Sequence, residues 1–245
     1  MKPASEKMRL DVLLVERGLA ESRQKAQALI MAGQVLVDGK PAEKAGRLVS
    51  AASRLEVLAG LPYVSRAGQK LEAALEFFGI NPQGKVCLDV GASTGGFADC
   101  LLQRGALRVY AVDVGTGLLD WRLRNDPRVV VREGINARYL RPEDIGEPIH
   151  LATCDVSFIS VTLVLPPVAA TLDARGELII LIKPQFEVGR RQVGKGGIVR
   201  DPELHAWACA RVEQTARSLG FETNLMPTPV FGAEGNKEFL LYAHR

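Results

Sequence analysis

The sequence predicts an α/β protein with a doubly wound parallel sheet of seven strands, preceded by a small α+β domain. From residue 68 onward, apolar strand-like runs alternate with helical stretches, which is typical of a parallel sheet covered by helices on both faces. The first 60 residues lack this alternation and contain two short helical runs followed by short strand-like runs. With 245 residues, the chain can hold one full α/β domain and one small module.

The composition is that of an ordinary globular protein, with 47% hydrophobic and 24% charged residues. This balance excludes disorder, collagen-like repeats and coiled coil as the main character of the chain. No signal-peptide core and no apolar run of roughly 18 residues is present, so we expect a soluble, cytoplasmic protein. The four cysteines lie far apart, without CxxC or Cys/His spacing, and are expected to be reduced thiols rather than metal ligands: Cys87, Cys100, Cys154 and Cys209.

The first domain is expected over residues 1–59. A short helix over residues 10–15 stops at Gly18, and Ser22 can cap a second helix that Gly33 closes. Two strands are expected on either side of an Asp38-Gly39 turn and a longer connection, at Val35–Val37 and Leu55–Leu58. The first 60 residues contain 10 basic and 7 acidic residues, whereas the remainder contains 21 of each, so the whole net charge of +3 lies here. This weak asymmetry indicates a polyanionic partner.

Residues 60–66 are predicted to be a linker, and residues 67–245 the second domain. Its seven strands are expected at Val86–Val90, Arg108–Val112, Val129–Val131, Leu151–Asp155, Leu178–Ile182, Glu222–Pro227 and Phe239–Ala243. Its main helices are expected at Lys70–Phe78, Phe97–Arg104, Val161–Leu172 and Glu203–Leu219. No helix separates the last two strands, which are therefore predicted to form an antiparallel hairpin. The ligand site of such a sheet lies at the carboxyl ends of the strands.

A glycine-rich turn, Asp89–Phe97, directly follows the first of these strands and directly precedes a helix. Its glycines let the backbone approach a ligand, and the helix amides can meet an anion. Asp113 ends the next strand, where a carboxylate commonly accepts hydrogen bonds from ribose hydroxyls. A dinucleotide, S-adenosylmethionine or no ligand at all could explain this turn. Ser93 replaces the second glycine of the dinucleotide fingerprint, which favours S-adenosylmethionine.

The same turn also matches the GxSxG nucleophile elbow of hydrolases over Gly91–Gly95. A hydrolase would need a later aspartate and then a histidine beyond a strand. Of the three histidines, His205 lies inside a predicted helix and His244 is the second-last residue; the third is His150. The sequence also lacks an HGGG-type oxyanion segment, so the hydrolase interpretation is disfavoured.

Charged residues border several apolar elements: Lys70, Asp155, Lys183 and Glu238. Asp155 and Lys183 each close a predicted strand, so both should lie at the edge that holds the glycine-rich turn. Charges at the ends of buried strands are costly unless they are paired. The segment from Lys183 to Arg200 adds five basic residues, one acid and four glycines. It is either a solvated loop or a basic flap that clamps a phosphate backbone.

The two parts of the chain resemble two different families. The segments Arg9-Leu-Asp, Ser22-Arg23, Gly33-Gln-Val and Val37-Asp-Gly-Lys resemble the S4 RNA-binding domain. This resemblance implies RNA contacts in the second helix and the following turn, at Arg9, Ser22, Arg23, Lys25, Gln27, Gln34 and Lys40. The basic flap adds three candidate RNA contacts, Arg190, Arg191 and Lys195.

The remainder resembles the FtsJ-type ribose 2′-O-methyltransferases. With SRAGQKLEAAL, LDVGASTGGF, DVSFIS, KPQFE and GNKE in this order, nearly the whole chain resembles the TlyA (haemolysin A) family of rRNA methyltransferases. The resemblance implies a Rossmann-like methyltransferase sheet with S-adenosylmethionine as cofactor and ribosomal RNA or ribosomal subunits as partner. The implied cofactor positions are Asp89, Gly91, Ser93, Thr94, Gly95, Gly96, Phe97, Asp113, Asn136 and Asp155.

The family's Lys-Asp-Lys-Glu tetrad matches Lys70, Asp155, Lys183 and Glu238. We hypothesise that Lys183 is the base that removes the proton of a ribose 2′-hydroxyl, since a lysine beside another cation can act as a base. Asp155 and Lys70 then position the hydroxyl, and Glu238 orients Lys183. In-line attack on the sulfonium methyl follows, with much of the catalysis coming from positioning.

Other methyl acceptors fit less well. Methylation of a base amino group usually needs an Asn-Pro-Pro-aromatic segment where DVSF stands here, and cytosine C5 methylation needs a cysteine nucleophile. Strand alternation turns Cys154 away from the side of Asp155, which favours a packing role. No apolar span or strongly basic amphipathic helix supports a pore-forming activity, and no obligate protein partner is indicated. A non-catalytic RNA-binding protein with a vestigial methyltransferase domain remains the alternative.

Overall fold

The computed structural model describes residues 7–31, 35–42, 44–57, 62–232 and 235–245. The chain divides into two compact units, Met1–Pro62 and Tyr63–Arg245. This boundary falls inside the segment 60–66 that the sequence suggests as a linker. Tyr63 already belongs to the second unit, where its side chain is buried and its hydroxyl donates to Glu72 at 2.8 Å. Gly33 and Leu58, two expected ends of elements, lie outside the described residues.

The first unit is a small α+β fold with two antiparallel sheets. Its elements are β1 (Lys7–Arg9), α1 (Leu10–Glu16), α2 (Arg23–Met31), β2 (Val35–Val37), β3 (Lys40–Pro41), β4 (Leu48–Ser50) and β5 (Leu55–Val57). One sheet pairs β1 with β4, and the other has the order β3-β2-β5. Both predicted helices and both predicted strands are present. The short strands β1, β3 and β4 were not predicted, because two or three residues carry too little alternation to be recognised.

Local signals explain the hairpin and the second helix. Asp38 and Gly39 both have a positive φ, 52° and 76°, as a two-residue hairpin turn between β2 and β3 requires. Ser22 Oγ accepts a hydrogen bond from Lys25 N at 3.2 Å and so caps α2, as expected. Leu10, Leu14 and Ile30 are buried between the helices and the strands.

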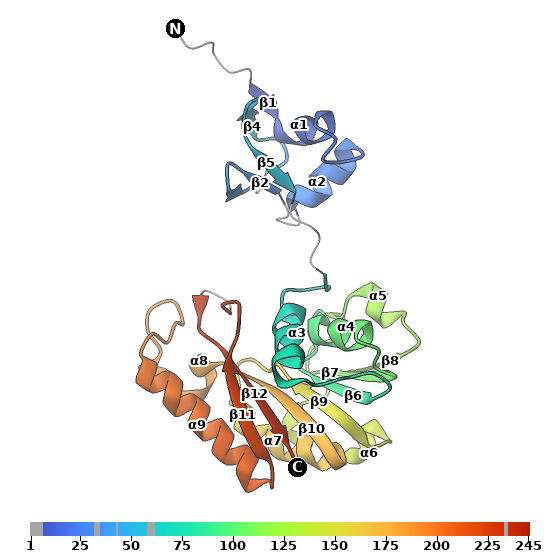
Figure 1. Cartoon of the computed structure of the whole chain (residues 1–245), viewed down its shortest axis with the longest axis vertical. Coiled ribbons are helices and arrows are strands. Elements are labelled where there is room, and N and C mark those ends of the chain that lie inside the picture. The colour runs from blue at the N-terminus through green and yellow to red at the C-terminus, as the bar shows by residue number, and fades with distance from the viewer. Residues whose placement is uncertain (1–6, 32–34, 43, 58–61, 233–234) are drawn as a thin grey trace. The chain divides into compact units, whose positions relative to one another are not determined.

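The second unit is a seven-stranded sheet with helices on both faces (Figure 1). Its strands are β6 (Val86–Val90), β7 (Arg108–Asp113), β8 (Val129–Glu133), β9 (Ile149–Cys154), β10 (Leu172–Ile182), β11 (Glu222–Pro227) and β12 (Phe239–His244). Its helices are α3 (Ala67–Phe78), α4 (Gly96–Gln103), α5 (Trp121–Arg124), α6 (Pro142–Ile145), α7 (Leu165–Thr171), α8 (Pro184–Glu187) and α9 (Pro202–Ser218). Within the described residues, the 3₁₀ turns are η1 (Ala137–Tyr139), η2 (Val161–Leu163) and η3 (Arg190–Gln192).

The strand order is β11-β12-β10-β9-β6-β7-β8. The strands β10, β9, β6, β7 and β8 are parallel, whereas β12 runs antiparallel to both of its neighbours. The doubly wound sheet and the terminal hairpin are therefore confirmed.

Alternation along the strands produces two cores, one on each face of the sheet. Leu88 and Val90 pack with residues of α7 and α9, whereas Cys87 and Val109 pack with residues of α3 and α4. All four cysteines are buried free thiols. The helices cover both faces of the sheet, and the loops that follow the parallel strands lie at its carboxyl edge.

Most element bounds differ by one or two residues from those expected, and three differences affect the architecture or the site. The predicted helix 161–172 is split into η2 and α7, because the prolines at positions 166 and 167 are compatible only with the first turn of a helix. β10 begins at Leu172 rather than Leu178, with a register shift before Glu177. α3 begins at Ala67, so Lys70 lies within its first turn instead of opening the helix.

Candidate functional site

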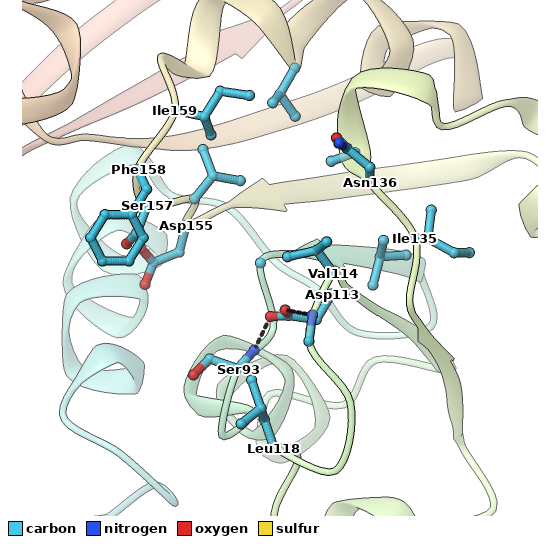
Figure 2. A pocket seen from close by; sticks show the side chains of 16 residues that line it. Ser93, Asp113, Val114, Leu118, Ile135, Asn136, Asp155, Ser157, Phe158 and Ile159 are labelled. Carbon is cyan, nitrogen blue, oxygen red and sulfur yellow. Dashed lines mark hydrogen bonds between the residues drawn. The ribbon is translucent and has the colours of Figure 1, made fainter.

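A cavity of about 480 Å³ lies at the carboxyl edge of the sheet, where the loops after β6, β7, β8 and β9 meet. Figure 2 shows Asp155, Ser157 and Phe158 on one side of this cavity, across from Asp113, Val114 and Asn136. Its volume lies within the range of small-molecule sites. This is the edge at which the sequence places the site.

The glycine-rich turn forms one wall and depends on unusual backbone conformations. Gly91 has φ 81°, and a Cβ at this position would lie 2.4 Å from the carbonyl oxygen of Asp155. Ser93 also has a positive φ, 49°, in spite of its side chain. Its backbone N–H donates to Asp113 Oδ2 at 2.8 Å, and Gly115 N donates to Asp113 Oδ1 at 2.8 Å. Asp113 therefore ties the loop after β6 to the loop after β7.

Asp89 supports the turn from inside the protein. Its carboxylate is fully buried and accepts hydrogen bonds from Ala98 N and from Thr153 Oγ1, each at 2.9 Å. Burial raises the pKa of Asp89 to about 7. Asp89 borders a second, smaller cavity of about 100 Å³ together with Thr94, Gly96 and Phe97. Its two bonds indicate that it holds the turn against α4 and β9.

The main cavity fits an adenosine-like group. Val114, Leu118 and Ile135 supply apolar walls. Asp113 supplies a carboxylate with lone pairs left to accept hydrogen bonds from hydroxyl groups. Asn136 Oδ1 accepts a hydrogen bond from Arg138 N at 3.1 Å, so its side chain caps η1 at the rim of the cavity. Polar groups at defined points of an apolar pocket are typical of such sites.

The four tetrad residues form two ion pairs. Lys183 Nζ lies 2.5 Å from Asp155 Oδ1 and donates to Ser157 Oγ at 2.8 Å. Lys70 Nζ donates to Glu238 Oε2 at 2.5 Å, with side-chain exposures of 11% and 2%. The expectation that Glu238 orients Lys183 is therefore wrong, because Glu238 contacts Lys70.

The sheet register explains how the tetrad converges. Ile182 pairs with Phe239, so Lys183 and Glu238 flank the same rung of the β10–β12 ladder. Asp155 directly follows β9, the neighbour of β10. The position of the Glu238 carboxylate also requires a glycine at position 232, since a Cβ there would lie 2.0 Å from Glu238 Oε1.

Phe158 is a candidate site residue that the sequence analysis missed. It lines the cavity, is 93% exposed and has φ 65°. Its ring lies 5.3 Å from that of Phe186. A left-handed conformation at an aromatic residue costs about 1–3 kcal/mol and persists only where the surroundings impose it. The sequence gives no sign of this conformation, because a positive φ is usually signalled by glycine and the segment DVSFIS contains none.

The basic segment after Lys183 is anchored at its far end. Val199 N donates to Asn236 Oδ1 at 3.1 Å, and Asn236 Nδ2 donates to Gly197 O at 3.0 Å. Val199 also packs with Val188 and Ala208 in a small core. The three candidate RNA contacts are exposed and form no ion pair with any residue that the structure describes: Arg190, Arg191 and Lys195.

In the first unit, three of the expected RNA contacts converge on one buried carboxylate. Asp11 is fully buried and accepts hydrogen bonds from Arg9, Arg23 and Gln27 at 2.8–3.0 Å. The neighbouring Arg9 side chain holds the pKa of Asp11 well below its usual range. The two guanidinium groups remain about half exposed, at 45% and 55%. Of the other expected contacts, Ser22 caps α2, Lys25 and Lys40 are exposed, and Gln34 lies outside the described residues.

The histidines do not support a hydrolase. His150 Nδ1 accepts a hydrogen bond from Val86 N at the opposite, amino edge of the sheet, where His244 also ends β12. His205 Nε2 is bonded to Val199 O at 2.9 Å. Among the described residues, no hydrogen bond joins any of the three to Ser93. In the described part of the chain, no helix is both long and apolar enough to cross a bilayer.

The two units define the class of the protein: a doubly wound fold with a glycine-rich cofactor turn, joined to a small nucleic-acid-binding-type module. The second unit matches the family model of FtsJ-like methyltransferases over residues 63–245, and the first matches the S4 domain model over residues 8–55. The chain belongs to the FtsJ-like methyltransferases and, among these, to the TlyA family with its N-terminal S4 domain. S-adenosylmethionine is the cofactor of this enzyme class.

Relatives match over nearly the full length. The 16S/23S rRNA (cytidine-2′-O)-methyltransferase TlyA of Mycobacterium tuberculosis is 48% identical over 97% of this chain and 90% of its own length. Hemolysin A of Brachyspira hyodysenteriae is 44% identical over 96% of this chain and 99% of its own length. A solved structure from Streptococcus thermophilus, 42% identical, superposes with a TM-score of 0.76 and covers 99% of this chain and 90% of that one.

Proposed function

We propose that this enzyme transfers a methyl group from S-adenosylmethionine to the 2′-hydroxyl of a cytidine in ribosomal RNA. The observation that carries the proposal is the pair of lysine–carboxylate contacts, Lys183–Asp155 and Lys70–Glu238, with Asp155 lining the cofactor cavity. A ribose hydroxyl needs a proton acceptor and precise positioning, and both are available there. The cytidine specificity follows that of the Mycobacterium tuberculosis relative, an rRNA (cytidine-2′-O)-methyltransferase.

The bound cofactor supplies an electrophilic methyl group. Lys183 accepts the proton of the 2′-hydroxyl while the oxygen–methyl bond forms and the carbon–sulfur bond breaks. Asp155, 2.5 Å away, stabilises the ammonium group that results. Lys70, held by Glu238, orients the hydroxyl oxygen through an N–H donor.

The acceptor nucleotide must leave its stack to reach this edge. Enzymes that modify a nucleotide commonly hold the flipped base between aromatic or apolar side chains. The exposed ring of Phe158 at the cavity rim offers such a contact. We assign Phe158 to the base and the Asp113–Asn136 side to the cofactor.

Affinity for RNA is assigned to the first unit and to the basic segment. Arg9 and Arg23 are aligned by Asp11, and Arg190, Arg191 and Lys195 are exposed near the second unit's loops. Phosphate contacts of this kind position a nucleic acid, and the pocket then selects the nucleotide. In this division of labour, residues 1–59 bind RNA and residues 67–245 carry out the transfer.

The test is methyl transfer from labelled S-adenosylmethionine to purified ribosomal subunits and to free rRNA. We expect one nucleotide to become labelled and its 3′ linkage to resist alkaline cleavage, since a 2′-O-methyl group blocks the attacking oxygen. Lys183→Ala should abolish labelling. Lys85→Ala is the matched control, because Lys85 pairs with Glu177 at the amino edge of the sheet, far from the cavity. Cofactor binding without transfer to any RNA would contradict the proposed acceptor, and RNA binding without cofactor binding would favour the vestigial-domain alternative.

A further inference from the structure

A buried carboxylate next to the tetrad is not used by the proposed mechanism. Glu187 ends α8, only four residues after Lys183, and is 4% exposed. Both of its oxygens accept hydrogen bonds from the loop after β9: Oε2 from Ser160 Oγ at 2.6 Å, and Oε1 from Val161 N at 2.8 Å. Its backbone carbonyl accepts a further bond from Arg211 at 2.7 Å, which fixes α8 against α9. A buried carboxylate is costly unless it is paired or hydrogen-bonded, and these bonds supply that compensation.

Glu187 belongs to a series of contacts between two chain segments. The segment after β10 meets the segment after β9 in order: Lys183 contacts Ser157, Phe186 packs on Phe158, and Glu187 binds Ser160. The two segments are thus fastened to each other at three successive points. Glu187 forms the last of these points, beyond the strained residue.

The strained residue is Phe158, whose positive φ needs support on both sides. On its N-terminal side, Asp155 and Ser157 are held by Lys183. On its C-terminal side, Ser160 is held by Glu187. The bonds of Glu187 therefore hold the C-terminal end of the loop that carries the exposed ring.

We infer that Glu187 is a positioning residue for the acceptor nucleoside: through Ser160 and Val161 it holds the Asp155–Ser160 loop, and with it the ring of Phe158, in the conformation that receives the base. The inference rests on the proposed function. It goes beyond it by assigning a role to a residue that does not face the cavity. The cofactor side, formed by the loops after β7 and β8, is not fastened by Glu187.

The test compares Glu187→Gln and Ser160→Ala with the full-length wild type. For Glu187→Gln we expect kcat/KM for RNA to fall by about 10- to 100-fold, because a misplacement of about 1 Å has this effect. Ser160→Ala keeps the carboxylate and its bond from Val161 N, but removes the bond from Ser160 Oγ to Glu187 together with the contacts of this hydroxyl with Thr162. It should act in the same direction. The Kd for S-adenosylmethionine should change by a smaller factor than kcat/KM for RNA in both variants. The Asp113–Asn136 side is untouched, although Asp155, which also lines the cavity, lies in the loop that Glu187 holds.

Glu147→Gln is the matched control. Glu147 also accepts two side-chain hydrogen bonds, from Tyr110 and Arg108, but it lies near the amino edge of the sheet. It should alter thermal stability without altering kcat/KM for RNA. A general structural role of Glu187 would give the same result as this control, which would overturn the inference.

A double-variant comparison tests the route. If Glu187 acts through the Phe158 ring, Glu187→Gln should have little further effect on the KM for RNA in a Phe158→Ala background. Full additivity of the two effects would overturn the inference, as would equal loss of cofactor binding. Absence of methyl transfer by the wild type would instead refute the proposed function, and the inference with it. Wild-type transfer with an unaffected Glu187→Gln enzyme would refute the inference alone.

Discussion

The Lys70–Glu238 pair allows stability and catalysis to be separated. Its side chains are 11% and 2% exposed and 2.5 Å apart, so removing either partner leaves a buried charge without its counter-ion. Such a change costs about 3–5 kcal/mol. We expect Lys70→Met and Glu238→Gln each to lower the unfolding free energy of the second unit by this amount. The melting temperature should fall by roughly 6–20 °C, at about 2–4 °C per kcal/mol for a domain of this size.

The double variant should behave differently. With both charges removed, no buried charge is left uncompensated, and the unfolding free energy should return to within about 2 kcal/mol of the wild type. Methyl transfer should nevertheless remain at least about 100-fold reduced in all three variants, because the positioning of the hydroxyl is lost. Recovered stability without recovered activity would show that the pair serves the reaction.

Urea unfolding followed by tryptophan fluorescence is the suitable assay. The chain has two tryptophans, Trp121 and Trp207, and both lie in the second unit. Arg141→Met, in an ion pair whose arginine is 70% exposed, is the control and should leave the unfolding free energy close to that of the wild type. A double variant as unstable as the two single losses combined would refute the reasoning. So would single variants with wild-type stability.

Three further predictions concern other parts of the chain. Because burial raises the pKa of Asp89 to about 7, the native state keeps a proton that the unfolded state has released above about pH 4. The unfolding free energy should therefore fall between about pH 4 and 7, by up to about 1.4 kcal/mol per pH unit, and Asp89→Asn should flatten this slope in urea titrations. Asp11→Asn removes the buried charge that holds Arg9 and Arg23. We expect the first unit to lose stability, seen by circular dichroism, and RNA binding to weaken while cofactor binding is unchanged. Asn236→Ala releases Gly197 and Val199, so trypsin should cleave after Lys195 or Arg200 several-fold faster than in the wild type, whereas an unchanged rate would contradict the anchoring role.

The architecture was predictable because its signals are local. Alternating strands and helices indicated the doubly wound sheet, and the two adjacent strands at the end indicated the hairpin of β11 and β12. The placement of Asp155 and Lys183 at the same edge of the sheet also followed from the topology alone. Short strands such as β3, with two residues, were beyond this reasoning, since they are stabilised by their partners rather than by their own pattern.

The contacts within the site were less predictable, because they depend on register and on side-chain direction. Glu238 pairs with Lys70 of α3 instead of Lys183, although it borders the same rung of the sheet as Lys183. Asp89 stands in the cofactor turn but directs its oxygens inward, to Ala98 and Thr153. In the sequence, Glu187 is simply the single acid of a basic segment, and no pattern around it predicts that its side chain is buried.

The observed pairing suits the proposed chemistry better than the pairing expected from sequence. Two carboxylates on Lys183 would favour its ammonium form twice over and oppose its action as a base. In the structure each lysine has one carboxylate, and Ser157 completes the surroundings of Lys183 with a neutral acceptor. The proton taken from the hydroxyl then arrives beside a carboxylate that is already in place, while Lys70 remains a fixed hydrogen-bond donor. In the proposed mechanism, the pairing of Glu238 with Lys70 rather than Lys183 therefore gives the two lysines different roles.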